Sequence, residues 1–376
     1  PESRLLAFKM ESMELAGIVD YRDLYDLVIS RIAEQPHVYL FFDELQNVEN
    51  WEKAINALRV DVDCDIYVTG SNAFLLSSEL ATLISGRYVE IPMQPLTFAE
   101  YLDFRGATWQ PAGKTGSDIA SFADGSFATL SNLFDQYRTF GGFPYLALQE
   151  PDESVHRGYM RSIYQTIIVR DIMMRAQRKG LRAVSNQAAL ERICAFMADN
   201  IGNETSINKI AGSLKADGQS VTRATTDFYI STLTEAYLFR HVLRYDVKGR
   251  ELLKTGGKYY IADVGMRNYL DSYRGTDTGR VLENLVFNQL LFDDYDVLIG
   301  HLRGGEVDFV ATKPRCKMYI QVTENMQDEE TQRRELASLR RIGDEYRKIV
   351  VVGEGSYPSD IDGIEIVSII DFLLHR

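Results

Sequence analysis

The sequence predicts an α/β protein whose first part is built on a parallel sheet, and three observations carry this prediction. Strand and helix patterns alternate through residues 1–105, which is typical of parallel strands covered by helices. Residues 38–42 (VYLFF) are continuously apolar, as in a buried strand. The chain of 376 residues is 45% hydrophobic and 25% charged, which is ordinary globular composition but too long for one small core. We therefore expect several domains.

Composition also limits the class of protein. The longest apolar runs are far shorter than the roughly 20 residues that span a bilayer, so we expect no membrane segment. The three cysteines, Cys64, Cys194 and Cys316, are widely separated, which gives neither a disulfide framework nor metal-ligand spacing. A reducing, cytoplasmic setting is therefore predicted. The sequence begins at Pro1 without Met or a leader, so we expect a chain that was processed or cut from a longer one.

The first domain is expected over residues 1–105. Helical periodicity predicts helices over 21–32 and 51–58, and apolar runs predict strands over 5–10, 38–42 and 65–68. Residues 106–127 are rich in Gly, Ser, Thr and Ala, which predicts a linker or an exposed insertion. The pattern from 130 to 183 is helical and is interrupted at 141–144 (GGFP). We therefore expect a linker and a helical lid segment over 106–185.

Two acids at the end of a predicted strand form the strongest chemical motif. Asp43 and Glu44 directly follow the apolar run 38–42, and ligands bind at the carboxyl ends of strands in open α/β sheets. Nucleotide hydrolases use this Walker B pattern: the Asp orients Mg²⁺ through its waters, and the Glu polarises the attacking water. The alternative is a structural strand end, because the pattern is short enough to arise by chance.

The following segments add polar candidates. The strand predicted at 65–68 ends in small polar residues that include Ser71 and Asn72, where AAA+ ATPases carry a side chain that hydrogen-bonds the γ-phosphate or the attacking water. Arg87 comes before 88–91, and a fixed guanidinium at such a place can stabilise transition-state charge. An exposed Arg beside a strand is the alternative.

A phosphate-binding loop of the form GxxxxGK[ST] does not occur in the printed sequence. The nearest match, 108–115, has Thr108 where the first Gly belongs, and it follows the acidic strand, whereas a P-loop precedes it. We interpret it as a chance match. The order of elements predicts a strand, a P-loop and a helix upstream of Pro1, encoded by roughly 40 further residues; loss of the loop is the alternative.

Residues 186–275 predict a helix, a turn, a second helix and a hairpin. Helices are expected over 206–214 and 221–233, and the segments 240–246 and 258–261 are expected to pair as a wing. If this module contacts DNA, Thr222, Arg223 and Thr226 should lie on the exposed face of the second helix. Contact with a protein is the alternative, because the helix has one basic residue.

Residues 276–376 predict an α/β domain with a second candidate site. A helix over 281–291, strands over 297–302, 306–311, 318–322 and 348–352, and a charged helix over 329–342 are expected. Glu283 and Asp308 match two acids of the PD-(D/E)xK nuclease pattern, in which carboxylates hold Mg²⁺ and a Lys assists the attacking water. Gln321 and Thr323 stand where that pattern has an acid and the Lys, so we expect a degenerate nuclease-like domain.

The chain resembles prokaryotic AAA+-like ATPases in which a P-loop core precedes a helical segment, a winged helix and a C-terminal domain related to PD-(D/E)xK nucleases. The resemblance follows the whole chain in order, through residues 41–48, 69–73, 85–90, 95–98, 141–144, 258–265 and 306–310. It implies ATP and Mg²⁺ as cofactors and the domain order ATPase core, lid, winged helix (186–275) and nuclease-like domain (276–376). The chain departs from the family in lacking the P-loop.

The charge distribution indicates where a nucleic acid would bind. The net charge is −13, yet residues 151–185 carry 7 basic and 3 acidic side chains, and 186–275 carry 12 and 10. Phosphate contacts need clustered Lys and Arg, so the middle of the chain is favoured, with a solvated helix face as the alternative.

We therefore expect an ATPase with DNA or a protein as partner. A non-catalytic binding scaffold and a Mg²⁺-dependent nuclease stay open as alternatives, and the sequence is compatible with an oligomer.

Overall fold

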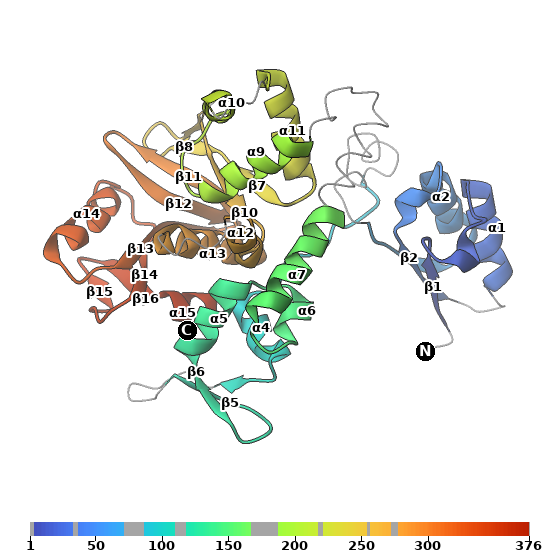
Figure 1. The fold of residues 1–376 in the computed structure, drawn as a ribbon, viewed down its shortest axis with the longest axis horizontal. Helices are drawn as coiled ribbons and strands as arrows, with labels where there is room; N and C mark the ends of the chain where they lie inside the picture. The colour runs from blue at the N-terminus through green and yellow to red at the C-terminus, as the bar shows by residue number, and fades with distance from the viewer. Residues whose placement is uncertain are drawn as a thin grey trace. The chain divides into compact units, whose positions relative to one another are not determined.

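The structure, a computed structural model, describes residues 4–32, 37–70, 86–109, 118–166, 187–216, 221–253, 256–271 and 277–375. The chain divides into two compact units, residues 1–92 with 235–237, and residues 93–234 with 238–376. The described residues of the first unit up to residue 70 are blue in Figure 1. No helix in the described part of the chain is long and apolar enough to cross a membrane.

The described part of the first unit contains a three-stranded parallel sheet with two helices. The strand order is β1-β2-β3, so β2 is the central strand. The alternation predicted from the sequence is confirmed, with β1 (Leu5–Lys9), α1 (Tyr21–Arg31), β2 (Val38–Asp43), α2 (Trp51–Asp61) and β3 (Cys64–Val68). Two short 3-10 turns, η2 (Met13–Leu15) and η3 (Leu45–Asn47), follow β1 and β2.

The two faces of this sheet differ. Alternate residues of β2, including Leu40 and Phe42, are buried in one core with the apolar residues of both helices. The opposite face carries Phe41 and Tyr67, whose rings stack with centroids 4.6 Å apart and remain partly exposed. Helix α1 begins at a capping box, because Asp20 accepts from the backbone of Asp23 and the Asp23 side chain accepts from that of Asp20. The pattern of buried residues thus fixes which side of the sheet the helices cover.

The second unit begins with helices and a small sheet. The helices are α4 (Phe98–Phe104), α5 (Leu130–Phe140), α6 (Pro144–Ala147) and α7 (Glu153–Ile163), with the predicted interruption at 141–144. Within the segment expected as a linker or insertion, three short antiparallel strands form a sheet of order β4-β5-β6, made of β4 (Thr108–Trp109), β5 (Ile119–Ser121) and β6 (Phe127–Thr129). These strands are too short to give a periodic signal in the sequence.

The two helices predicted after residue 186 are confirmed as α10 (Ile207–Ala216) and α11 (Arg223–Glu235). The structure adds α9 (Gln187–Asp199) before them and α12 (Val264–Leu270) after them. The predicted pairing of the wing segments is found between β7 (Phe239–Val242) and β10 (Lys258–Ile261), which are antiparallel. The residues between β7 and β10 do not continue this pairing. Instead, β8 (Arg244–Asp246) pairs with β9 (Glu251–Leu252) and also joins the C-terminal sheet.

The C-terminal sheet has eight strands in the order β15-β16-β14-β13-β12-β11-β8-β9. Its predicted elements are confirmed as α13 (Thr278–Phe292), β11 (Asp296–Leu302), β12 (Gly305–Lys313), β13 (Cys316–Asn325), α14 (Glu329–Arg340) and β14 (Arg347–Glu354). The chain ends with β15 (Asp360–Ile361), β16 (Ile364–Ser368) and α15 (Ile369–Leu373). Figure 1 shows helices α13 and α14 beside this sheet. The two helices belong to separate cores, because Ile320 of β13 packs with residues of α13 and Tyr319 packs with residues of α14.

Candidate functional site

Asp43 is the last residue of the central strand β2, and its side chain is exposed at the carboxyl end of the sheet. Thr69, directly after β3, donates its hydroxyl to Asp43 Oδ1 at 2.7 Å. The Thr69 backbone N–H donates to the Phe42 carbonyl at 2.8 Å, which continues the pairing of the two strands. Because parallel neighbours end at the same edge, β2 and β3 bring these two side chains together. The result is an oriented carboxylate of the kind that binds Mg²⁺ directly or through water.

Glu44 follows in a left-handed backbone conformation, with φ 55°, and is half-buried. Few residues other than glycine adopt this conformation, and those that do are concentrated at functional sites and turns. The side-chain amide of Gln46 donates to the Glu44 carboxylate. The second amide atom of this side chain, Gln46 Oε1, is buried and has no hydrogen-bond partner among the described residues. The turn after β2 therefore holds the second acid next to Asp43 and beside a buried polar atom.

The remaining candidates in the first unit are placed less fully. Ser71 and Asn72 lie outside the described residues, so their positions near Asp43 stay predictions. Arg87 is exposed and lies in a segment, 86–92, without helix or strand. The structure thus brings together Asp43 and Thr69, with Glu44 as the next residue after Asp43.

A second group of ionisable side chains surrounds Lys258 at the start of β10 in the second unit. Its Nζ lies 3.1 Å from Glu283 Oε1, 2.5 Å from Glu306 Oε1 and 3.9 Å from Asp308 Oδ1. The Tyr260 hydroxyl donates to Glu283 Oε1 at 2.5 Å. The Lys258 side chain is 7% exposed. Helix α13 and strands β10 and β12 therefore converge on one buried ammonium, and the two acids predicted together, Glu283 and Asp308, are both next to it.

The charges in this group influence one another strongly. Burial raises the pKa of Asp308 well above its ordinary value, and the neighbouring Glu283 carboxylate raises it further. Burial alone would lower the pKa of Lys258, but the carboxylates of Glu283, Asp308 and Glu306 outweigh it and raise that pKa. The ammonium is therefore charged at neutral pH, and three acids are paired with this one positive charge.

Gln321 is not part of this group, contrary to the expectation from the sequence. It lies on the side of the sheet that α14 covers, and its side-chain nitrogen donates to Glu335 Oε2 at 3.1 Å. A bulge in β12 is the physical reason that Asp308 and Gln321 lie on different sides of the sheet. Leu298 of β11 pairs with Val310, but Gly300 pairs with Val307, so β12 contains one extra residue between these two pairs. Such a bulge changes the direction of side chains next to it.

Thr323 supplies no substitute for the missing Lys. Its hydroxyl is buried and donates to the Asn325 carbonyl at 3.1 Å. The backbone N–H of Val322 donates to Asp308 Oδ2 at 2.8 Å. This end of β13 therefore contributes a backbone donor, and no side-chain cation, to the group.

One of the three predicted nucleic-acid contacts is wrong. Thr222 and Arg223 are exposed at the start of α11, and Thr222 caps the helix by accepting from the Thr225 N–H at 3.1 Å. Thr226 is fully buried, and its hydroxyl donates to the Thr222 carbonyl at 3.1 Å. The reason is helical spacing, since Thr226 lies on the same face of α11 as the buried residue Tyr229.

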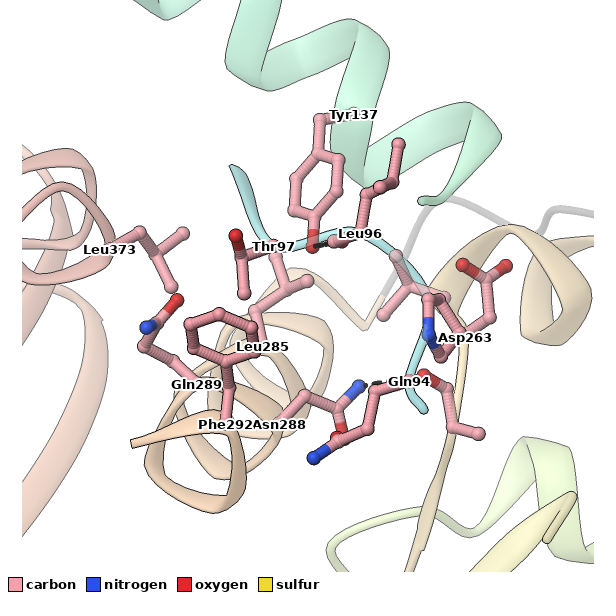
Figure 2. Close-up of a pocket in the computed structure, with 13 residues that line it drawn as sticks. Gln94, Leu96, Thr97, Tyr137, Asp263, Leu285, Asn288, Gln289, Phe292 and Leu373 are labelled. Carbon is pink, nitrogen blue, oxygen red and sulfur yellow. Dashed lines mark hydrogen bonds between the residues drawn. The ribbon is translucent and has the colours of Figure 1, made fainter. Parts of the chain in front are cut away.

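The small cavity in Figure 2 lies at a structural junction. Its volume is about 20 Å³, which has room for about one water molecule. Asp263 Oδ2 accepts from the Gly142 N–H at 2.7 Å and Oδ1 accepts from the Met266 N–H at 2.9 Å, while the Tyr137 hydroxyl donates to the Leu96 carbonyl. Burial raises the pKa of Asp263 to about 6, against the lowering effect of the backbone donors. These contacts join the 141–144 turn to α12 and leave no space for a substrate.

Two family models match separate parts of the chain. Residues 1–102 match the model of a family described as an AAA domain, and residues 131–277 match a domain of unknown function (DUF8612). An "Uncharacterized protein" of Haemophilus influenzae is 34% identical over 371 residues, which is 98% of this chain and 86% of that protein. The chain belongs to the family of this Haemophilus influenzae protein.

A further relative is matched over a smaller share of both chains. An uncharacterized protein of Methanocaldococcus jannaschii is 31% identical over 275 residues, which is 72% of this chain and 58% of that protein. Among solved structures, the Walker-type ATPase of Pyrococcus abyssi is 14% identical, with 69% of this chain and 68% of that chain covered and a TM-score of 0.35. A likeness at that TM-score carries no argument about mechanism.

In this family member, the candidate residues fall into different matched parts. Asp43, Glu44, Thr69 and Arg87 lie within the AAA domain match, whereas Lys258 lies within the second match. Sequence reasoning did not single out Thr69, Gln46 or Lys258 as site residues. The position of Thr69 at the end of the next parallel strand was a usable signal, but an isolated Lys in a short strand such as β10 gives none.

Proposed function

We propose that this chain is an AAA-type ATPase that binds and hydrolyses ATP with Mg²⁺ at the carboxyl end of β2. The observation that carries the proposal is the Asp43 carboxylate, fixed by the Thr69 hydroxyl at 2.7 Å inside the part that matches the AAA domain. Glu44 stands next to it in a constrained backbone conformation. Two acids at the end of a central parallel strand, with a polar residue from the neighbouring strand, are the groups that nucleotide hydrolysis requires.

The residues present fit Mg²⁺ together with a nucleotide. In proteins Mg²⁺ keeps several waters and is held by one or two carboxylates and the substrate phosphates, so a complete protein cage is not needed. Bound Mg²⁺ neutralises charge on the phosphates.

Each residue then has a separate role. Asp43 would hold the ion directly or through a water, and Thr69 would keep that carboxylate in one orientation. Glu44 would polarise the attacking water and accept its proton, with Gln46 orienting its carboxylate. Ser71, Asn72 and Arg87 remain candidates for contact with the γ-phosphate.

The proposal couples this ATPase to a winged helix and a degenerate nuclease-like domain. Arg223 and Thr222, exposed at the start of α11, support nucleic-acid contact, because the N-terminus of a helix favours phosphate. In the alternative, the same module contacts a protein partner instead of a nucleic acid. The acids Glu283 and Asp308 support the nuclease-like relationship, and the positions of Gln321 and Thr323 support its degeneracy.

The test is Mg²⁺-dependent ATP hydrolysis by the full gene product. Asp43→Asn should lower turnover by about a hundredfold or more, because a neutral amide holds the cation weakly. Asp26→Asn, an exposed Asp on α1, is the matched control and should behave as the wild type. Equal turnover in both variants, or no nucleotide binding by the wild type, would contradict the proposal.

A further inference from the structure

The acids around Lys258 are held by contacts with protein atoms. Lys258 Nζ lies within 3.9 Å of three carboxylates that come from α13 and β12. The same Glu283 oxygen that binds the ammonium also accepts from Tyr260, and the second Asp308 oxygen accepts from the Val322 N–H. The side chains of Lys258, Glu283 and Asp308 are 7%, 13% and 11% exposed. One oxygen of Glu283 and one of Asp308 therefore already accept hydrogen bonds from the protein, and the ammonium lies 3.9 Å from the other Asp308 oxygen.

A divalent cation in this position would need a different arrangement. Mg²⁺ demands oxygen ligands at about 2.0–2.1 Å in near-octahedral geometry, and it keeps some of its waters. No group of three His, Cys, Asp or Glu in the described ranges could hold a metal ion, although three acids surround Lys258. The two expected acids thus fit a cation, but the arrangement does not fit Mg²⁺.

The cation present is the ammonium itself. Buried carboxylates are stable only when they are paired or neutralised, and three of them in one place need a positive charge. Lys258 supplies one from β10, a strand that is separate from β13, where the nuclease pattern would have its Lys. Glu306, which is 32% exposed, lies at the outer side of the group and is the acid most open to solvent.

We propose that the ammonium of Lys258 occupies the cation position of this carboxylate group, so that the nuclease-like domain binds no divalent metal there and cleaves no phosphodiester. The inference assigns a role to Lys258 that is independent of the ATPase proposal. It predicts that removing the ammonium turns the buried acids into a divalent-metal site. Because it concerns metal binding in the second unit, its failure and the failure of the ATPase proposal are separate results.

The first measurement compares the wild type with Asp308→Asn. Mn²⁺ is titrated into the full chain without nucleotide, and bound Mn²⁺ is followed by electron paramagnetic resonance. The number of bound ions should be equal in the two proteins, because Lys258 excludes the metal from this group. A saturable Mn²⁺ site in the wild type that Asp308→Asn removes would overturn the inference. So would cleavage of plasmid DNA with Mg²⁺ or Mn²⁺ that Asp308→Asn abolishes.

The second measurement removes the ammonium. Lys258→Met should gain one Mn²⁺ site per chain, and adding Glu283→Gln in the same chain should remove it. Lys258→Arg keeps a cation and is the matched control, which should gain none. Thermal unfolding of Lys258→Met should shift to higher temperature with Mn²⁺, even if this variant folds poorly without the metal. Neither a new site nor a Mn²⁺-dependent shift in Lys258→Met would overturn the inference.

Discussion

At the scale of single residues, a hydroxyl directly after β3 orients a carboxylate at the end of the neighbouring strand β2. Thr69 donates to Asp43 at 2.7 Å, and it can do so because β2 and β3 are parallel neighbours that end at the same edge. An oriented acceptor needs less rearrangement when a cation binds, which is the general advantage of a fixed polar group in an active site. Thr69 therefore becomes a positioning residue in the ATPase proposal.

Thr69→Val tests this role. The substitution keeps the shape of the side chain and removes the hydroxyl, so the full gene product should lose about tenfold in ATP turnover, the value of one hydrogen bond of roughly 1.4 kcal/mol. The required Mg²⁺ concentration should rise at the same time, which a merely structural role would not produce. Thr69→Ser keeps the hydroxyl and should retain most of the turnover. Unchanged turnover in Thr69→Val, or a larger loss in Thr69→Ser than in Thr69→Val, would contradict this role of the hydroxyl.

The sequence predicted some of these residues and not others. Asp43 and Glu44 follow a continuous apolar run, so their place at a strand end could be derived from pattern alone. Glu283 and Asp308 were also predicted together, but Lys258 and Glu306 were not, because the group joins residues 25 and 48 or more positions apart through the packing of α13 and β12 on β10. Gln321 was assigned to the wrong group, since a bulge in β12 has no signal in the sequence.

At the scale of secondary-structure elements, close backbone contacts join α12 to the end of α5. A Cβ added at Gly265 would lie 2.2 Å from the Phe140 carbonyl oxygen, and one at Gly142 would lie 2.3 Å from the Leu96 carbonyl oxygen. Asp263 accepts backbone donors from both sides of this junction. The turn at 141–144 was predicted from its Gly-Gly-Phe-Pro composition, but the contact with α12 depends on tertiary packing.

Gly265→Ala should destabilise the protein. The added methyl meets backbone atoms that cannot rotate away, so we expect a loss of about 2 kcal/mol or more in the free energy of unfolding, measured with urea. Gly158→Ala is the matched control, because nothing lies within 4 Å of its Cβ position in helix α7. That variant should be more stable by about 0.5–1 kcal/mol, as expected for a glycine in a helix. Equal effects of the two substitutions would contradict the close contact.

At the scale of the whole molecule, the charge distribution separates the parts of the chain. The net charge is −13, while residues 151–185 carry 7 basic and 3 acidic side chains.

The strands of the parallel sheet and the elements of the C-terminal domain were predicted well, because their apolar runs are long and periodic. The strands β4 to β6 were not, because each has two or three residues.

Arg223→Ala tests nucleic-acid contact by the module that contains α11. If Arg223 meets a phosphate, the affinity of the protein for DNA should fall modestly on all sequences, and the slope of log affinity against log salt should decrease by about one. Fluorescence anisotropy with a labelled duplex at several salt concentrations measures both. Arg333→Ala, an exposed Arg on α14, is the control and should leave both unchanged. Absence of binding at low salt would favour a protein partner.

The measurement that tests the central claim most directly is ATP turnover and ATP affinity in Glu44→Gln, with Glu11→Gln, an exposed acid of the same unit, as control. The amide cannot accept a proton from the attacking water, so turnover of the full gene product should fall by on the order of a hundredfold or more while ATP affinity stays at the wild-type value. Glu11→Gln should match the wild type in both. Unchanged turnover in Glu44→Gln would contradict the claim and leave Glu44 as a structural acid at the end of β2.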